Sequence, residues 1–88
     1  MTLYSITYDL KKPERDYSGL YDTIKSFGNW WHYLESTWII KSDKTPDEIF
    51  DNIKPHIDNN DYLIITEITN KYSGWLPKEA WDWIKSNI

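Results

Sequence analysis

Polar and apolar residues alternate along the beginning of the chain. Between residues 2 and 10 every second side chain is apolar, and Leu3 is the one exception among the polar positions between them. A period of two with aromatic and β-branched residues predicts a strand that has one apolar face. Pro13 and the charges around it end this strand. The alternating apolar positions are Tyr4, Ile6, Tyr8 and Leu10.

The period changes after this strand. Over residues 16–27 apolar side chains recur at intervals of three and four, which predicts a helix with one apolar stripe. Either Asp16 or Ser18 can cap its start, and Gly28 followed by Asn29 is a typical left-handed helix end. The stripe consists of Tyr17, Leu20, Tyr21, Ile24 and Phe27.

Residues 29–42, NWWHYLESTWIIKS, are rich in Trp, Tyr, Ile and Thr and carry no strong helix signal. We expect two strands, about 30–35 and 37–42, that meet in a tight turn near Glu35 and Ser36. The turn lacks the Asn-Gly or Asp-Gly pair typical of hairpins, so one long bent strand is the alternative.

The stretch TPDE at 45–48 predicts a helix start. Thr45 is suited to the N-cap and Pro46 to the first helical position, and Glu48 completes a capping box. Pro55 must kink or end this helix because it lacks a backbone N–H and crowds the preceding turn. The helix would bury Ile49, Phe50, Ile53 and Ile57.

Residues 62–68, YLIITEI, follow a polar turn, DNND, and form the clearest strand, which is apolar on both sides. Such a strand belongs at the centre of a sheet, or its second face meets a partner. A loop or a short edge strand around Trp75 comes next. A last helix begins near Pro77, with an apolar face made of Trp81, Ile84 and Ile88.

These elements predict an α+β fold of the ferredoxin-like type, β-α-β-β-α-β with an antiparallel sheet and an added C-terminal helix. We expect one domain over residues 1–88, with its core in 1–70 and a C-terminal extension in 71–88. Two helices cover only one face of such a sheet. The other face should therefore be covered by the tryptophan-bearing tail or by a second subunit.

Composition narrows the class of partner. The chain has no cysteine, so it has neither disulfides nor a thiolate metal site. Aromatic residues make up 17%, more than a small core can enclose, which favours self-association or, failing that, a ligand pocket or a base-stacking surface. The net charge of −4 argues against a general nucleic-acid coat. Neither a signal peptide nor a membrane span is visible, so we expect a cytoplasmic protein.

The opening LYSITYDL is similar to that of the small CRISPR-associated subunit of the spacer-integration complex, a dimeric ferredoxin-like family once assigned metal-dependent nuclease activity. In that family the first strand ends in Tyr-Asp and an aliphatic residue, as Tyr8, Asp9 and Leu10 do here. GNWWHYLESTWII looks like the family's Gly-containing turn and Ser-aromatic strand pair. The chain also resembles short bacterial and phage proteins labelled SinR-like. The resemblance covers about residues 2–68.

The resemblance implies that Asp9 lies near a dimer axis, where two symmetry-related carboxylates hold one Mg²⁺ for phosphoryl chemistry. Tyr8 and the cations Lys11, Lys12 and Arg15 would position phosphate, although these cations replace a more arginine-rich segment in the family. The simpler alternative for Asp9 is a solvated or helix-capping carboxylate, or one paired with Lys11 or Arg15. For the cations it is a rim of exposed charges.

The aromatic strand supplies two further candidate binding residues, His32 and Trp31. With a pKa near neutrality, His32 could act as a general acid or base, and a hydrogen-bonded histidine in a strand pair is the alternative. Strand alternation places Trp30 and Trp31 on opposite faces, so only one is interior, and an exposed indole offers a stacking surface. Trp83 is the best candidate for an exposed ring that meets a partner.

The resulting hypothesis is a small homodimeric protein that binds nucleic acid or nucleotides, with Mg²⁺-dependent nuclease activity through Asp9 as one form of it. The alternative is a non-enzymatic bacterial or phage interaction protein that sequesters a nucleotide signal or blocks a defence protein. A toxin-like endoribonuclease of the virulence-associated protein D type shares the expected fold. Fold alone does not choose among them.

Overall fold

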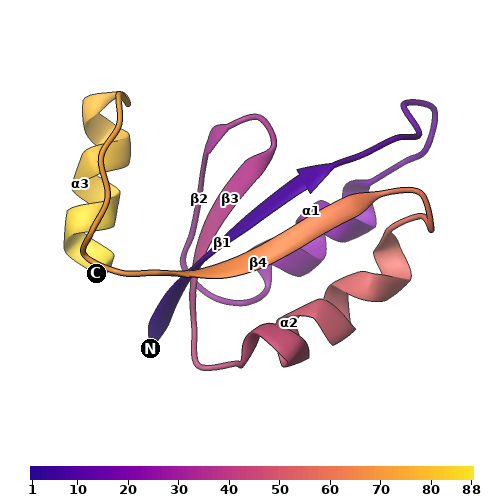
Figure 1. The fold of residues 1–88 in the computed structure, drawn as a ribbon, viewed down its shortest axis with the longest axis horizontal. Coiled ribbons are helices and arrows are strands. Elements are labelled where there is room, and N and C mark those ends of the chain that lie inside the picture. Colours follow the sequence, from indigo (N-terminus) through magenta and orange to yellow (C-terminus); the bar gives the residue numbers. More distant parts are fainter.

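Four strands form one antiparallel sheet in the order β2-β3-β1-β4 (Figure 1). The structure, a computed structural model, describes all of residues 1–88. The strands are β1 Thr2–Asp9, β2 Trp30–Leu34, β3 Thr37–Ser42 and β4 Tyr62–Ile68.

Three α-helices complete the fold, α1 Ser18–Lys25, α2 Pro46–Ile53 and α3 Lys78–Asn87, and a single 3₁₀ turn, η1 Lys54–His56, extends α2. The order of elements along the chain is the predicted one. In Figure 1, α1 and α2 lie on one side of the sheet, and α3 stands apart from them. No helix combines the length and the apolar character that a membrane crossing requires.

The main core lies between the sheet and the helices α1 and α2. The alternation predicted for β1 sends Tyr4, Ile6 and Tyr8 into this core, while Leu3 points to the opposite face. The helical stripes of α1 and α2 complete it from the other side. Its fully buried members include Ile6, Leu20, Ile24, Trp38, Ile40, Ile49 and Ile53.

A second, smaller core lies on the opposite face of the sheet, which we call the second face. Here Leu3, Trp31 and Ile39 pack against Ala80 and Ile84 of α3. The tail thus covers part of the face that the sequence left open to either a tail or a second subunit. The rest of the second face, toward the ends of β1 and β4 that carry Asp9 and Tyr62, is not covered by the tail.

The position of β4 corrects the expectation that this strand is central. It is an edge strand that pairs only with β1, and Tyr62 and Ile64 are 70% and 61% exposed on the second face. The pattern was apolar on both sides because Leu63 and Ile65 face the helices, while Tyr62 and Ile64 face outward.

Local signals placed the ends of α2 well, whereas α1 has Tyr17 at its N-cap and ends at Lys25, three residues before Gly28. Thr45 and Glu48 form the predicted capping box, with hydrogen bonds of 3.2 and 2.9 Å. α2 ends at Ile53, and Pro55 lies inside the 3₁₀ turn that follows. A two-residue turn at Glu35 and Ser36 separates β2 from β3, so the alternative of one long bent strand is wrong.

The segment between β4 and α3 has no regular structure, so the short edge strand considered around Trp75 does not form. Trp75 is 98% exposed, whereas Trp83 packs partly buried against the second core. The most exposed ring is therefore Trp75 and not Trp83. Of the two adjacent strand tryptophans, Trp31 is interior and Trp30 is exposed, as the alternation requires.

Candidate functional site

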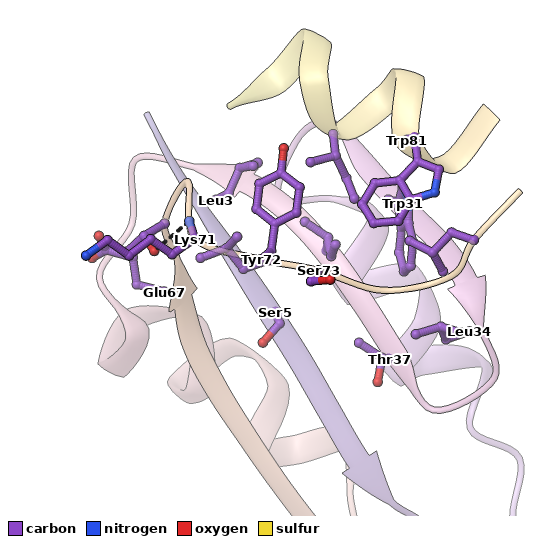
Figure 2. Close-up of a pocket in the computed structure, with 15 residues that line it drawn as sticks. Leu3, Ser5, Trp31, Leu34, Thr37, Glu67, Lys71, Tyr72, Ser73 and Trp81 are labelled. Atoms are coloured by element: carbon purple, nitrogen blue, oxygen red, sulfur yellow. Dashed lines mark hydrogen bonds between the residues drawn. The ribbon is translucent and has the colours of Figure 1, made fainter. Parts of the chain in front are cut away.

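A groove of about 340 Å³ lies between the second face of the sheet and the segment that leads from β4 to α3 (Figure 2). Strands β1 and β3 form its floor, and α3 closes one side. Nine of its fifteen lining residues are hydrophobic, so its interior is mainly apolar. Its lining includes Ser5, Trp31, Thr37, Lys71, Tyr72 and Trp81.

Aromatic rings form one wall of the groove. The rings of Tyr72 and Trp81 are nearly parallel, at 20°, with centroids 6.0 Å apart. Trp31 lies beside them and donates its indole N–H to the carbonyl of Ala80 at 3.2 Å, which ties β2 to α3. Trp31 is only 2% exposed, so it supports this wall from below and is not an open stacking surface.

Hydroxyl groups form a row across the uncovered part of the second face. Ser5 and Thr66 are 3.2 Å apart, and Thr7 and Thr37 are 3.3 Å apart. Each pair joins neighbouring strands in register, since Ser5 is opposite Thr66 and Thr7 is opposite Thr37. Ser5 and Thr37 also line the groove, so its apolar interior has a floor that can accept and donate hydrogen bonds.

Opposite charges stand at one end of the groove. Figure 2 shows Glu67 and Lys71 together there, while Leu34 and Thr37 lie toward the other end. The groove thus combines a volume within the usual range of ligand pockets, an apolar lining and a few polar groups. Such an arrangement suits a small planar ligand whose polar edge meets the hydroxyls.

Asp9, the residue predicted to hold a metal, lies outside this groove at the end of β1. Its carboxylate accepts from the Lys11 ammonium at 2.6 Å, and this hydrogen bond raises the pKa of Lys11 above its usual value. Both side chains are largely exposed. The Lys11 ammonium also lies 5.8 Å from the ring centre of Tyr62, which is opposite Asp9 in register. Pairing with Lys11 was the simpler of the two interpretations of Asp9.

Few side chains near Asp9 could bind a metal ion. The chain contains no group of three or more His, Cys, Asp or Glu side chains that could hold a metal ion. One carboxylate that is already paired with an ammonium group offers a poor Mg²⁺ site, because this ion takes six oxygen ligands. A magnesium site at Asp9 would need ligands from a second chain, water or substrate.

Lys12 and Arg15 converge on one carboxylate. The Lys12 ammonium and the Arg15 guanidinium each lie 3.8 Å from the same oxygen of Asp58. The three predicted phosphate-binding cations thus stand among the carboxylates of Asp9, Asp58 and Asp61, which offset their charge. The cluster is a rim of ion pairs in which a phosphate would compete with carboxylates.

Asp61 is the polar residue that the sequence did not single out. Only 8% exposed, it accepts from the Tyr17 hydroxyl at 2.8 and 3.0 Å, and from the backbone N–H groups of Lys11 and Asp58 at 2.7 and 2.8 Å. Burial alone raises the pKa of Asp61, but these hydrogen bonds outweigh it and hold the pKa below its usual value. Its only sequence signal was its place at the end of the DNND turn.

Tyr8 and His32 meet at the β2–β3 turn, on the side of the sheet that faces the helices. Tyr8 donates to the carbonyl of Glu35 at 3.3 Å and accepts from the Trp38 indole at 3.1 Å, and burial raises its pKa. The His32 ring stacks on Trp38 at 3.8 Å, with Nε2 3.1 Å from the same carbonyl. His32 therefore has the hydrogen bond expected in the alternative to a general acid or base, a histidine bonded within a strand pair.

The predicted site residues thus fall into separate places. Asp9 and Lys11 form one pair, Lys12 and Arg15 gather at Asp58, Tyr8 and His32 share Glu35, and Trp31 supports the groove. No protein-family model, characterised protein or solved structure matches this chain. The groove is the feature whose geometry resembles a binding site most closely.

Proposed function

We propose that this chain is a small binding protein of the ferredoxin-like type, whose groove takes a nucleotide or a base of a single-stranded nucleic acid. The strand order β2-β3-β1-β4, together with the alternation of strands and helices along the chain, supports the ferredoxin-like assignment. The observation that carries the ligand is the groove of about 340 Å³ with Tyr72 and Trp81 on its wall.

The lining offers one contact for each part of a nucleotide. Aromatic rings stack on bases without regard to sequence, and Tyr72 is half-exposed beside the groove. The hydroxyls of Ser5 and Thr37 can hydrogen-bond a base edge or a sugar. Lys71 at the end of the groove can meet a phosphate, and the charge of the neighbouring Glu67 favours few phosphates over many.

Intrinsic tryptophan fluorescence tests this function, because Trp31 and Trp81 line the groove. Titration with mononucleotides, cyclic nucleotides and short oligonucleotides should give a saturable change in emission. Tyr72→Ala should weaken binding about tenfold through lost stacking, whereas Tyr62→Ala, at a more exposed tyrosine outside the groove, should not.

The same titration tests the contribution of the Lys71 charge to phosphate binding. Lys71→Ala should weaken nucleotide binding about threefold and leave binding of the matching nucleoside unchanged. Lys85→Ala on α3, whose side chain does not line the groove, is the matched control. No fluorescence change with any of these ligands, or equal effects of Tyr72→Ala and Tyr62→Ala, would rule the groove out as the site.

The homodimeric nuclease is a second candidate, favoured by the position of Asp9. Asp9 shares the uncovered part of the second face with the exposed Tyr62 and Ile64, so two copies that meet there bring their Asp9 carboxylates together. Light scattering gives the oligomeric state. Cleavage of RNA and DNA with Mg²⁺ or Mn²⁺ should then disappear in Asp9→Asn and persist in Asp82→Asn, and a monomer without cleavage would end this candidate.

A further inference from the structure

The outer edge of β4 is a second feature of the molecule, separate from the groove. β4 pairs with β1 on one side only, so its other side presents unpaired backbone N–H and C=O groups. Natural edge strands are usually protected by lysine, proline, a bulge or short length. This strand has seven residues without lysine or proline, and its single charge is Glu67 near the C-terminal end.

A hollow runs along this edge. It measures about 290 Å³, lies between α2 and β4, and is lined mainly by apolar residues. A strand added to β4 would place alternate side chains over this hollow and beside Ile64. Phe50, which is part of the lining, remains one-third exposed. The lining residues are Pro46, Asp47, Phe50, Leu63, Ile64 and Ile65.

The charge on α2, beside this edge, is acidic, with Lys44 before the helix and Lys54 directly after it. α2 carries Asp47, Glu48 and Asp51 and no cation between Pro46 and Ile53, and the Glu48 side chain is occupied by the capping box. Asp47 lines the hollow, and Asp51, four residues on, lies on the same side of the helix. Glu67 adds a third exposed carboxylate on β4 itself.

The acidic charge of α2 discriminates between two possible occupants of the edge, a second copy of this chain and an extended segment of another protein. A second copy that pairs through the same edge around a two-fold axis would repeat the acidic groups on both sides, and like charges across an interface are unfavourable. An extended segment with cationic side chains would meet opposite charge along α2. The unpaired edge, the apolar hollow and the acidic charge therefore all favour an extended segment with apolar and cationic side chains.

We propose that the edge of β4 docks an extended segment of a partner protein whose side chains on the face toward α2 include both apolar and basic residues. The segment adds a fifth strand to the sheet by backbone hydrogen bonds, its apolar side chains enter the hollow beside Phe50, and its cations face Asp47 and Asp51. The nucleotide groove lies on the second face and shares only Glu67 and Ile68 with β4.

The probe is a labelled peptide in which every second residue is threonine and the residues between are valine and lysine in turn, so that valine and lysine share one face of the added strand. Its fluorescence anisotropy should rise and saturate on addition of the protein, and the affinity should fall with added salt. Two control peptides of equal length replace lysine by glutamate, or alternate residues by proline, which cannot donate ladder hydrogen bonds. Neither control should bind. Backbone amide shifts in residues 62–66 of β4 should move on binding, and those of the groove residues should not.

Three variants locate the site. Ile64→Lys places a cation on the edge and should weaken binding at least about tenfold. Asp47→Asn should weaken it about threefold, while Glu79→Gln on α3 makes the same change of charge elsewhere and should have no effect. Circular dichroism checks that each variant is folded.

Several results would overturn this proposal. These are no saturable binding of the lysine peptide, equal binding of either control peptide, amide shifts confined to the groove, or a homodimer that Ile64→Lys dissociates. The last result would assign the surface around Ile64, whether on the edge or on the second face, to a second copy. Since nucleotide titrations report on the groove alone, failure of the peptide leaves the proposed function standing, and failure of nucleotide binding leaves the edge proposal standing.

Discussion

The hydroxyl of Tyr17 donates to both carboxylate oxygens of Asp61, at 2.8 and 3.0 Å, at a buried point between two loops. The same carboxylate accepts from the N–H groups of Lys11, in the loop after β1, and of Asp58, in the turn before β4. Burial of the Tyr17 hydroxyl and its bond to Asp61 raise the pKa of Tyr17. One side chain therefore fixes two connections that lie far apart in the sequence.

Replacing Asp61 by Asn should lower the free energy of unfolding by about 2 kcal/mol, because the amide keeps one acceptor oxygen and turns N–H donors toward existing donors. Urea denaturation followed by circular dichroism measures the loss. Asp22→Asn, at an exposed position of α1, is the control and should change stability by less than about 0.5 kcal/mol. Equal effects of the two substitutions would mean that the Asp61 hydrogen bonds contribute nothing.

Acid should weaken the fold in a defined window. The pKa of Asp61 is lower in the folded chain than its usual value, so the unfolded chain takes up the proton first as pH falls. The stabilisation is complete above the usual aspartate pKa, declines below it, and is lost once pH passes the folded pKa. Backbone hydrogen bonds also lower the pKa values of Asp16 and Glu48, which share this window.

Unfolding free energies measured from neutral pH downward test this dependence. The curve of Asp61→Asn should be flatter than that of the unaltered chain in the acidic window, and the remaining slope belongs to groups such as Asp16 and Glu48. Parallel curves for the two proteins would show that Asp61 does not titrate with folding.

Local patterns predicted the elements of this fold well. The alternation in residues 2–10, the capping box at Thr45 and the break at Pro55 each depend on neighbours along the chain, so the sequence contains the whole cause. Of the two alternatives for β4, the central position was wrong for the opposite reason. An apolar pattern on both sides is shared by a central strand and by an edge strand with one exposed face, and sheet order depends on pairing between distant segments.

The binding features depended on distant contacts as well. Asp61 meets its partners Tyr17 and Lys11 at separations of 44 and 50 residues, which no periodicity encodes. The groove exists because an irregular segment crosses the sheet between β4 and α3, so Tyr72 had no recognisable signal. Trp31 was a candidate by composition, but only packing against Ala80 shows that it supports the groove wall.

The capping box makes a separable prediction. Thr45→Ala should cost about 1 kcal/mol, because the N–H of Glu48 then loses its acceptor at the start of α2. Glu48→Gln should cost less, since glutamine also returns a hydrogen bond to the N-cap N–H. Thermal or urea unfolding measures both. A larger loss in Glu48→Gln than in Thr45→Ala would mean that charge at the helix start matters more than the cap.

Gly28, in the turn between α1 and β2, has a backbone conformation that other residues rarely adopt. Its φ is +135°, and a Cβ at this position would stand 2.8 Å from the carbonyl oxygen of Lys41. Gly28→Ala should therefore destabilise the protein by about 2 kcal/mol. Gly74→Ala is the matched control, since its Cβ would meet nothing closer than Trp81 at 3.9 Å, and it should be neutral or slightly stabilising. A neutral Gly28→Ala would contradict the described turn.

The bond from Trp31 to Ala80 links the groove to the attachment of α3. Trp31→Phe keeps an aromatic ring but removes the N–H that reaches the Ala80 carbonyl at 3.2 Å, so the last helix should be held less tightly. Hydrogen exchange in Lys78–Asn87 should become faster by about fivefold, and because α3 forms a wall of the groove, nucleotide affinity should fall with it. Trp30→Phe, at the exposed neighbouring position, should leave both unchanged. Unaltered exchange in α3 of the Trp31 variant would show that apolar packing alone, through Leu3, Ile39 and Ile84, holds the tail on the sheet.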